Sequence, residues 1–173
     1  LDAMIQQGKI RYIGVSNCYA WQIAKANEIA KARHLHSFVS VQGHYNLIFR
    51  EEEREMKPYC DLHHVALTPY SALASGRLAK HPGEQSQRLK EDTYAKGKYD
   101  QSYNQDLPII LRVEELAQKH HVSMSEIALS WLMTKVTAPI VGATKCSHID
   151  TAIRAVDCHL TPDECQYLEA CYQ

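Results

Sequence analysis

Four short apolar runs, each ending in polar residues and followed by a helical pattern, constrain the fold of this chain more than any other feature. They predict strands at residues 11–17, 37–42, 65–67 and 138–145. No hairpin signal joins one run to the next, so the strands are expected to be parallel. Parallel strands bring the polar groups at their carboxyl ends to one rim of an α/β fold, where active sites form. The sequence therefore predicts an α/β protein with a functional rim.

The number of strands leaves two architectures open. Four strands make half of an eight-stranded (β/α) barrel, and an open four-stranded parallel sheet is the alternative. Ser123 and Thr161 begin capping boxes, and Thr144 or Ser147 is expected to cap the helix after the fourth run. The predicted helices cover residues 1–8, 19–33, 107–120, 126–134, a segment ending at 156, residues 161–172, and a further helix opening at residue 50.

Residues 80–106 form a long polar stretch inside what is otherwise expected to be a single domain, residues 1–173. The stretch is too long for an idle connection in a compact domain. We interpret it as a mobile loop without a catalytic role, and the alternatives are disorder or a lid that orders over a ligand.

Composition sets ordinary bounds on the class of protein. The 173 residues are 45% hydrophobic and 23% charged with a net charge of −1, which is typical of a soluble globular chain. The balanced charge gives no reason to expect nucleic acid or a membrane surface as a partner. The six cysteines show neither C-x-x-C pairs nor zinc-type spacing, so reduced thiols in a cytoplasmic protein are expected and no metal site is predicted. The chain opens inside a helical pattern, which suggests a fragment of a longer protein.

The third rim segment offers a flat ring beside small residues. Tyr70 follows the strand end, and Ser71, Ser75 and Gly76 supply hydroxyl groups and close backbone approach. This combination suits a planar ring followed by phosphates, and a structural tyrosine with an ordinary turn is the alternative.

The fourth rim segment suggests an anion site. Lys145, Ser147 and His148 lie where a helix is expected to begin, and its first N–H groups and dipole both favour negative charge. The alternative is that Lys145 is simply exposed and His148 packs. Neither G-x-G-x-x-G nor G-x-x-x-x-G-K-[ST] occurs, so a dinucleotide would not be held in the Rossmann manner.

These segments resemble a known family when they are taken together. YIGVSN at 12–17, QGHYNL at 42–47, TPYSALASGRL at 68–78 and PIVGATK at 139–145 are similar to the C-terminal part of the aldo-keto reductases. The resemblance runs from Gly8 to the end, and it is closest to the bacterial, potassium-channel-β-like branch. It implies the C-terminal half of a (β/α)8 TIM barrel with four parallel strands. It also implies NADP(H)-dependent reduction of small aldehydes and ketones to alcohols.

The resemblance assigns cofactor-binding residues by position. Ser16, Asn17 and Gln42 would hydrogen-bond the nicotinamide carboxamide, whose donors and acceptor they can satisfy. Tyr70 would stack on one nicotinamide face and leave the other for hydride transfer. The pyrophosphate would lie on Ser71, Leu73, Ser75 and Gly76, and the last motif adds Gly142 together with Thr144, Lys145 and His148 for the adenosine 2′-phosphate.

The catalytic residues are expected to lie outside this chain. The family's Asp, Tyr, Lys and His belong to the second to fourth barrel strands, and the first strand here corresponds to the fifth. His44 is the rim residue with acid–base capacity, although a structural role is favoured. Thr151 and Ala152 stand where many relatives have a Glu-Asn pair on the adenine side.

A half barrel has consequences for activity and assembly, and two other functions stay open. The chain is expected to show little turnover alone, and its exposed edges favour self-association. A non-catalytic NADPH-binding or regulatory subunit is one alternative function. A flavodoxin-like open-sheet module is the other.

Overall fold

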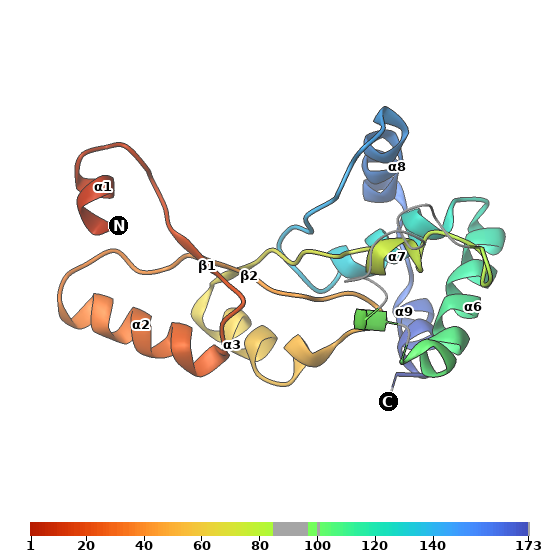
Figure 1. Ribbon diagram of the computed structural model, residues 1–173, viewed down its shortest axis with the longest axis horizontal. Coiled ribbons are helices and arrows are strands. Elements are labelled where there is room, and N and C mark those ends of the chain that lie inside the picture. Colours follow the sequence, from red (N-terminus) through yellow and green to blue (C-terminus); the bar gives the residue numbers. More distant parts are fainter. Residues whose placement is uncertain (85–96, 100, 173) are drawn as a thin grey trace.

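The computed structural model describes residues 1–84, 97–99 and 101–172. A small parallel sheet lies in the middle of the molecule with α3 beside it, α1 and α2 towards one end and α6, α7, α8 and α9 towards the other (Figure 1). The helices are α1 (Asp2–Gln6), α2 (Ala20–Ala32), α3 (Met56–His63), α6 (Tyr103–His120), α7 (Met124–Met133), α8 (Cys146–Asp157) and α9 (Pro162–Glu169), with the short 3-10 turns η1 (Glu51–Glu53) and η2 (Ala74–Gly76).

The first three predicted strands are confirmed, although each is shorter than predicted. β1 (Gly14–Ser16), β2 (Ser40–Gln42) and β3 (Ala66–Leu67) are parallel and lie in the order β1-β2-β3. Val41 pairs with Val15 on one side and with Leu67 on the other. An isolated parallel bridge between His44 and Tyr70 continues the pairing beyond the strand ends. The carboxyl ends of all three strands therefore share one rim.

The prediction of a fourth strand at residues 138–145 is wrong, because this segment is not a strand in the structure. The segment nevertheless runs beside β3: Thr137 N donates to Leu67 O at 3.1 Å, and Ile140 N donates to Pro69 O at 2.8 Å. Pro69 has no N–H with which to return a bond, so a regular parallel ladder cannot form at this point. The chain is therefore α/β with three parallel strands and a fourth extended segment at the edge.

The predicted helices are present, but the helix expected to open at residue 50 begins at Met56, after the 3-10 turn η1, and one cap also differs. The capping boxes at Ser123 and Thr161 are both formed. The N-cap of α8 is Lys145, which has extended backbone angles and makes no side-chain cap hydrogen bond. Neither Thr144 nor Ser147 is the cap, because Thr144 lies one residue too early and Ser147 is already inside the helix. The first N–H groups of α8 are thus left without a side-chain acceptor from its N-cap.

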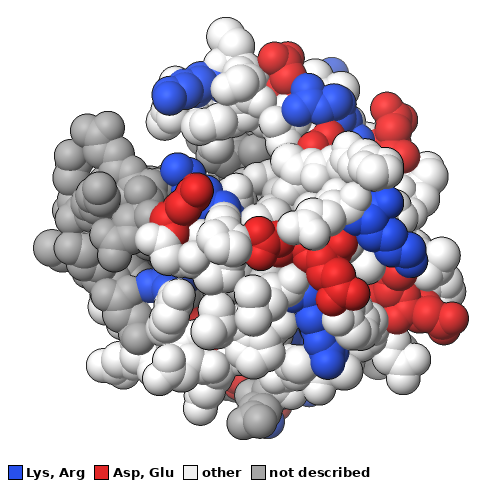
Figure 2. Space-filling model, turned by 90° about the vertical axis from the view of Figure 1, so that its right-hand side faces the viewer, with Lys and Arg blue, Asp and Glu red and all other residues white. Residues whose placement is uncertain are grey.

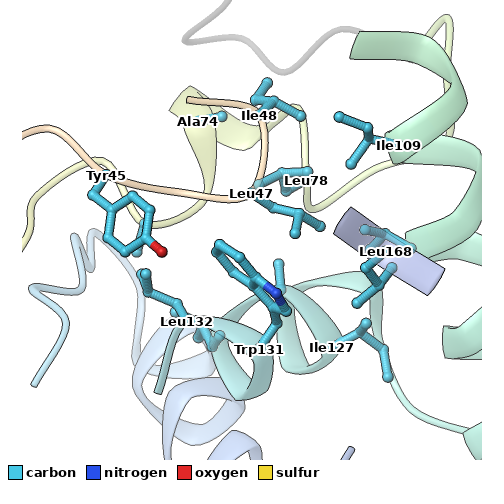
Figure 3. Close-up of a cluster of buried hydrophobic side chains, with 14 of the residues drawn as sticks. Tyr45, Leu47, Ile48, Ala74, Leu78, Ile109, Ile127, Trp131, Leu132 and Leu168 are labelled. Atoms are coloured by element: carbon cyan, nitrogen blue, oxygen red, sulfur yellow. The ribbon is translucent and has the colours of Figure 1, made fainter. Parts of the chain in front are cut away.

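The main hydrophobic core joins the segments after β2 and β3 to the C-terminal helices (Figure 3). Trp131 and Leu132 of α7 are fully buried against Leu47 and Leu78 from those two segments. Burying one such aliphatic side chain stabilises the fold by about 1.5–3 kcal/mol. The rim segments are therefore anchored by their own apolar side chains. Tyr45, Ile109, Ile127 and Leu168 also belong to the cluster.

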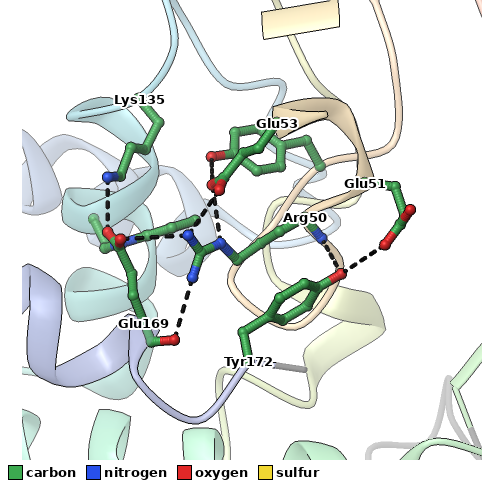
Figure 4. A network of polar contacts seen from close by, with 8 residues as sticks. Arg50, Glu51, Glu53, Lys135, Glu169 and Tyr172 are labelled. Carbon is green, nitrogen blue, oxygen red and sulfur yellow. Dashed lines mark hydrogen bonds and ion pairs between the residues drawn. The ribbon is translucent and has the colours of Figure 1, made fainter. Parts of the chain in front are cut away.

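A polar network holds the same parts together (Figure 4). The Arg50 guanidinium pairs with Glu53 at 2.7 Å and with Glu169 of α9 at 3.3 Å. Glu169 also accepts from Trp131 Nε1 at 2.8 Å and pairs with Lys135 at 2.7 Å. Every charge in this partly buried group has a partner, as burial of charge requires. The network ties the residues after β2 to α7 and α9.

About half of the long polar stretch predicted at residues 80–106 lies outside the described residues, which omit 85–96 and 100. Its last part is helical, because α6 begins at Tyr103.

Lys and Arg side chains alternate with Asp and Glu over the face that Figure 2 shows. No helix in the described parts of the chain is long and apolar enough to span a bilayer.

Candidate functional site

The structure brings the predicted residues at the ends of the three strands into one hydrogen-bonded group. The Tyr70 hydroxyl donates to Asn17 Oδ1 at 3.0 Å, although the two residues are far apart in sequence. Asn17 Nδ2 donates to Ser16 Oγ at 2.9 Å. Ser16 Oγ and Asn17 N both donate to the Gln42 carbonyl, at 3.1 and 3.0 Å. Ser16, Asn17, Gln42 and Tyr70 therefore form one cluster at the rim.

The Gln42 side-chain amide has spare hydrogen-bonding capacity. Gln42 is half-buried at the end of β2, and no hydrogen bond joins its side-chain amide to another described residue. Its N–H groups and oxygen can therefore pair with an amide-bearing ligand. Such a complementary donor and acceptor set fits a carboxamide.

The Tyr70 ring is fixed by a stack of aromatic rings. His44 stacks with Tyr70 at 5.6 Å between ring centroids and with Phe49 at 4.0 Å, both at an interplanar angle of 21°. The Lys98 ammonium lies 4.9 Å from the centre of the Tyr70 ring. Offset ring contacts of this kind add stabilisation beyond burial alone. The ring is half-exposed, so it can still contact a ligand.

The turn after Tyr70 has an unusual backbone. Ser71, Ala74, Ser75 and Gly76 all have positive φ, from 48° at Ala74 to 97° at Gly76. Its internal bonds include Ala74 N to Ser71 O at 2.9 Å and Gly76 N to Leu73 O at 2.8 Å. Ala74, Ser75 and Gly76 are three consecutive left-handed residues, and the N–H groups of Ala74 and Gly76 are already bonded within the turn. The predicted pyrophosphate residues Ser71, Leu73, Ser75 and Gly76 lie together in this turn.

The remaining predicted residues form a separate, exposed group at the start of α8. Gly142, Thr144, Lys145 and His148 are all exposed, and Thr144 N contacts His148 Nδ1 at 3.4 Å. In the part of the chain that the structure describes, no hydrogen bond or ion pair joins these residues to the cluster around Tyr70. Lys145 forms no ion pair with a described residue either. This group is therefore open to an anion from solvent.

Sequence reasoning missed a buried polar group behind Tyr70. His44, Asn46 and Tyr99 are almost fully buried and hydrogen-bonded to one another. Burial, and then the nearby Lys98, lowers the pKa of His44 to about 3, and burial raises the pKa of Tyr99 to about 12. His44 is thus uncharged at neutral pH and unsuited to general acid catalysis there. Asn46 lies in the QGHYNL motif at 42–47. Tyr99 lies in a polar stretch without periodicity, so no pattern in the sequence indicated Tyr99.

No cluster of His, Cys, Asp and Glu in residues 1–84, 97–99 and 101–172 has the arrangement of a metal site. The described side chains of the rim are amides, hydroxyls, aromatic rings and exposed cations, which can bind and orient a ligand.

Comparison with known proteins identifies the family. The Aldo/keto reductase family model matches residues 1–173, and the chain belongs to this family. It is 44% identical to the aldo-keto reductase dtxS3 of Metarhizium robertsii over 174 residues, 99% of this chain and 47% of that protein. It is 41% identical to the versiconal hemiacetal acetate reductase of Aspergillus parasiticus, with 99% and 51% of the two chains covered.

Solved structures show the same fold. The glycerol dehydrogenase AKR11B4 of Gluconobacter oxydans superposes with a TM-score of 0.77 at 22% identity, over 98% of this chain and 51% of that one. The thermostable aldo-keto reductase Tm1743, crystallised with the inhibitor epalrestat, gives 0.69 at 25% identity with the same coverage. The chain thus spans about half the length of the relatives that it matches.

Proposed function

We propose that this chain is the nicotinamide-cofactor-binding half of an NADP(H)-dependent aldo-keto reductase that reduces aldehydes or ketones to alcohols. The observation that carries the proposal is the meeting of Asn17, Gln42 and Tyr70, from three separate strand ends, beside the left-handed turn at 71–76. Family membership and a reductase among the relatives support the reaction class.

Each group at the rim has a defined task in this proposal. The free Gln42 amide, with Asn17 and Ser16, hydrogen-bonds the carboxamide and sets the rotation of the nicotinamide ring. Tyr70 covers one face of that ring, so that only the opposite face is open to a substrate. The bound cofactor supplies the hydride, and the protein supplies orientation and electrostatics. The turn at 71–76 is assigned to the pyrophosphate, through the Ser71 and Ser75 hydroxyls and those N–H groups that are not bonded within the turn.

The preference for NADP(H) over NAD(H) is assigned to the start of α8. Lys145 is exposed and has no ion-pair partner among the described residues, and the helix N-terminus beside it favours an anion. The 2′-phosphate distinguishes the two cofactors, so the charge of Lys145 acts on one of them only. Thr144 and His148 add polar contacts at the same place.

The acid that protonates the carbonyl oxygen is not assigned to this chain. His44 is buried and neutral, and the Tyr45 hydroxyl donates to Glu53 at 2.5 Å within the polar network. We infer that the family's catalytic Asp, Tyr, Lys and His belong to the half of the barrel that this chain does not span. The chain by itself is expected to bind cofactor and to show little turnover.

A cofactor titration tests this proposal. NADPH and NADH are titrated separately while nicotinamide fluorescence and tryptophan quenching are recorded, and the size of the protein is measured in parallel. Lys145→Ala removes a charge-assisted contact of about 1.5–3 kcal/mol, so NADPH should bind at least about tenfold more weakly. NADH binding should be unchanged.

The matched control is Lys31→Ala, which removes an exposed lysine from α2. It should change neither cofactor's affinity. Equal losses of NADPH and NADH in Lys145→Ala would contradict the 2′-phosphate role. Absence of any signal from the unmodified chain at millimolar NADPH would reject cofactor binding altogether.

A further inference from the structure

The three polar side chains that lie buried behind the rim are His44, Asn46 and Tyr99, which are 7%, 0% and 2% exposed. Burying polar groups costs free energy unless each one is hydrogen-bonded. None of the three has a task in the function proposed above. Their role is therefore sought in the neighbouring segments that they hold in place.

Asn46 joins the segment after β2 to the turn after β3. Its Oδ1 accepts from Ile48 N at 3.0 Å, and its Nδ2 donates to the Ser71 carbonyl at 2.9 Å. Exchanging the two amide atoms would set donor against donor and acceptor against acceptor. The amide orientation is therefore fixed by its partners.

His44 and Tyr99 complete the arrangement. The Tyr99 hydroxyl and Asn46 Nδ2 lie 2.7 and 3.2 Å from His44 Nε2. Asn46 Nδ2 also lies 3.2 Å from the Tyr99 hydroxyl, so the three side chains form one closed hydrogen-bonded group. This fixes the plane of the imidazole ring, which in turn stacks with Tyr70.

The turn that Asn46 contacts needs external support. Ser71 has φ 58°, Ala74 48° and Ser75 56°, a conformation that costs free energy for residues other than glycine. Such strain persists only where the surroundings determine the backbone more strongly than its own preference does. The Ser71 carbonyl accepts both from Asn46 and from Ala74 N at 2.9 Å, so Asn46 bonds the first residue of the strained turn.

We propose that Asn46, supported by His44 and Tyr99, is a positioning residue that holds the turn at 71–76 and the Tyr70 ring in their binding conformation before a ligand arrives. Asn46 touches no ligand itself. It acts through the Ser71 carbonyl and through the rings of His44 and Tyr70. The part of this inference that concerns NADPH rests on the function proposed above.

The first test needs no cofactor. Amide hydrogen exchange is followed in Asn46→Ala and in the matched control Asn27→Ala. Asn27 also bonds backbone through both amide atoms, to Phe38 N at 2.8 Å and Phe38 O at 3.1 Å, but it lies away from the rim. We expect exchange of the amides at 70–76 to become about tenfold faster in Asn46→Ala only, as the loss of one buried hydrogen bond implies.

The second test separates the two ends of the cofactor. NADPH and adenosine 2′-monophosphate, which lacks both the nicotinamide and the pyrophosphate, are titrated into the same variants. Asn46→Ala should weaken NADPH about tenfold and leave the monophosphate unchanged, while Asn27→Ala should change neither. Equal weakening of both probes, or unchanged exchange at 70–76, would overturn the positioning role.

A milder variant covers the case in which Asn46→Ala does not fold. Tyr99→Phe removes only the hydroxyl that contacts His44, and it should accelerate exchange at Tyr70 and in the turn by a smaller factor. Exchange that matches the unmodified chain would also overturn the proposal. If the unmodified chain binds neither probe, the proposed function fails, and the exchange measurements still decide the positioning role.

Discussion

The rim of this molecule has two parts that are built in opposite ways. Behind Tyr70 and Ser71, the side chains of His44, Asn46 and Tyr99 are buried and hydrogen-bonded, and the segments continue into the core through Leu47 and Leu78. At the start of α8, Thr144, Lys145 and His148 are exposed, and they share one contact, Thr144 N to His148 Nδ1 at 3.4 Å. The first part is thus preformed, whereas the second offers charge without fixed geometry.

This difference suggests that the two parts of the rim recognise different groups of a ligand. A flat ring is recognised by geometry, which needs rigid surroundings and rewards burial. A phosphate is recognised by charge, which acts over a longer range and tolerates mobile side chains. The structure supplies rigidity where the nicotinamide is proposed to bind and exposed charge where the 2′-phosphate is proposed to bind.

The largest expected effect concerns pH and the buried part of the rim. In the unfolded chain a histidine titrates near 6.5, whereas burial lowers the pKa of His44 to about 3. Between these values the unfolded state binds more protons, so stability is full above pH 6.5 and is lost as the pH falls towards 3. His44 should remove up to about 2 kcal/mol of unfolding free energy between pH 6.5 and 5.

His44→Gln keeps a polar side chain and removes the titration. Urea unfolding at pH 7 and pH 5 should therefore show a smaller loss of stability in this variant than in the unmodified chain. Lys98 is the charged neighbour that also lowers this pKa, so Lys98→Met serves as the control and should reduce the pH effect only slightly. An identical pH dependence in His44→Gln and the unmodified chain would show that His44 is not held neutral.

A smaller effect compares two glycines, one in each part of the rim. Gly76 has φ 97°, so Gly76→Ala should lower the free energy of unfolding by about 1–2 kcal/mol. A Cβ at Gly142 would meet no atom within 4 Å, so Gly142→Ala should change it by less than about 1 kcal/mol. Chemical denaturation of both variants measures the difference. Equal losses would show that the two parts of the rim are equally constrained.

Local patterns predicted most of the fold. The periodic apolar residues of α7 and the capping boxes at Ser123 and Thr161 determine where those helices begin, and the structure confirms them. The absence of a fourth strand was not predictable from residues 138–145 alone. It depends on the neighbouring segment, where Pro69 has no N–H to donate to a ladder. A strand depends on its partner, so a pattern within one segment cannot establish it.

The candidate site was predictable where a motif ends a strand, as at Asn17, Gln42 and Tyr70. The supporting residues were not, because support depends on contacts between distant segments. Tyr99 reaches His44 from a stretch with no periodic signal, and the positive φ of Ser71 and Ala74 is not encoded by glycine. Whether the individual residues bind the cofactor as assigned stays a prediction.

The most direct measurement is the set of nuclear Overhauser contacts from bound NADPH to the protein. The account predicts that nicotinamide protons contact the Tyr70 ring and the side chains of Asn17 and Gln42, while adenosine protons contact residues 144–148. The same NADPH molecule must show both sets. Contacts confined to another surface, or nicotinamide protons with no contact to Tyr70, would contradict the account.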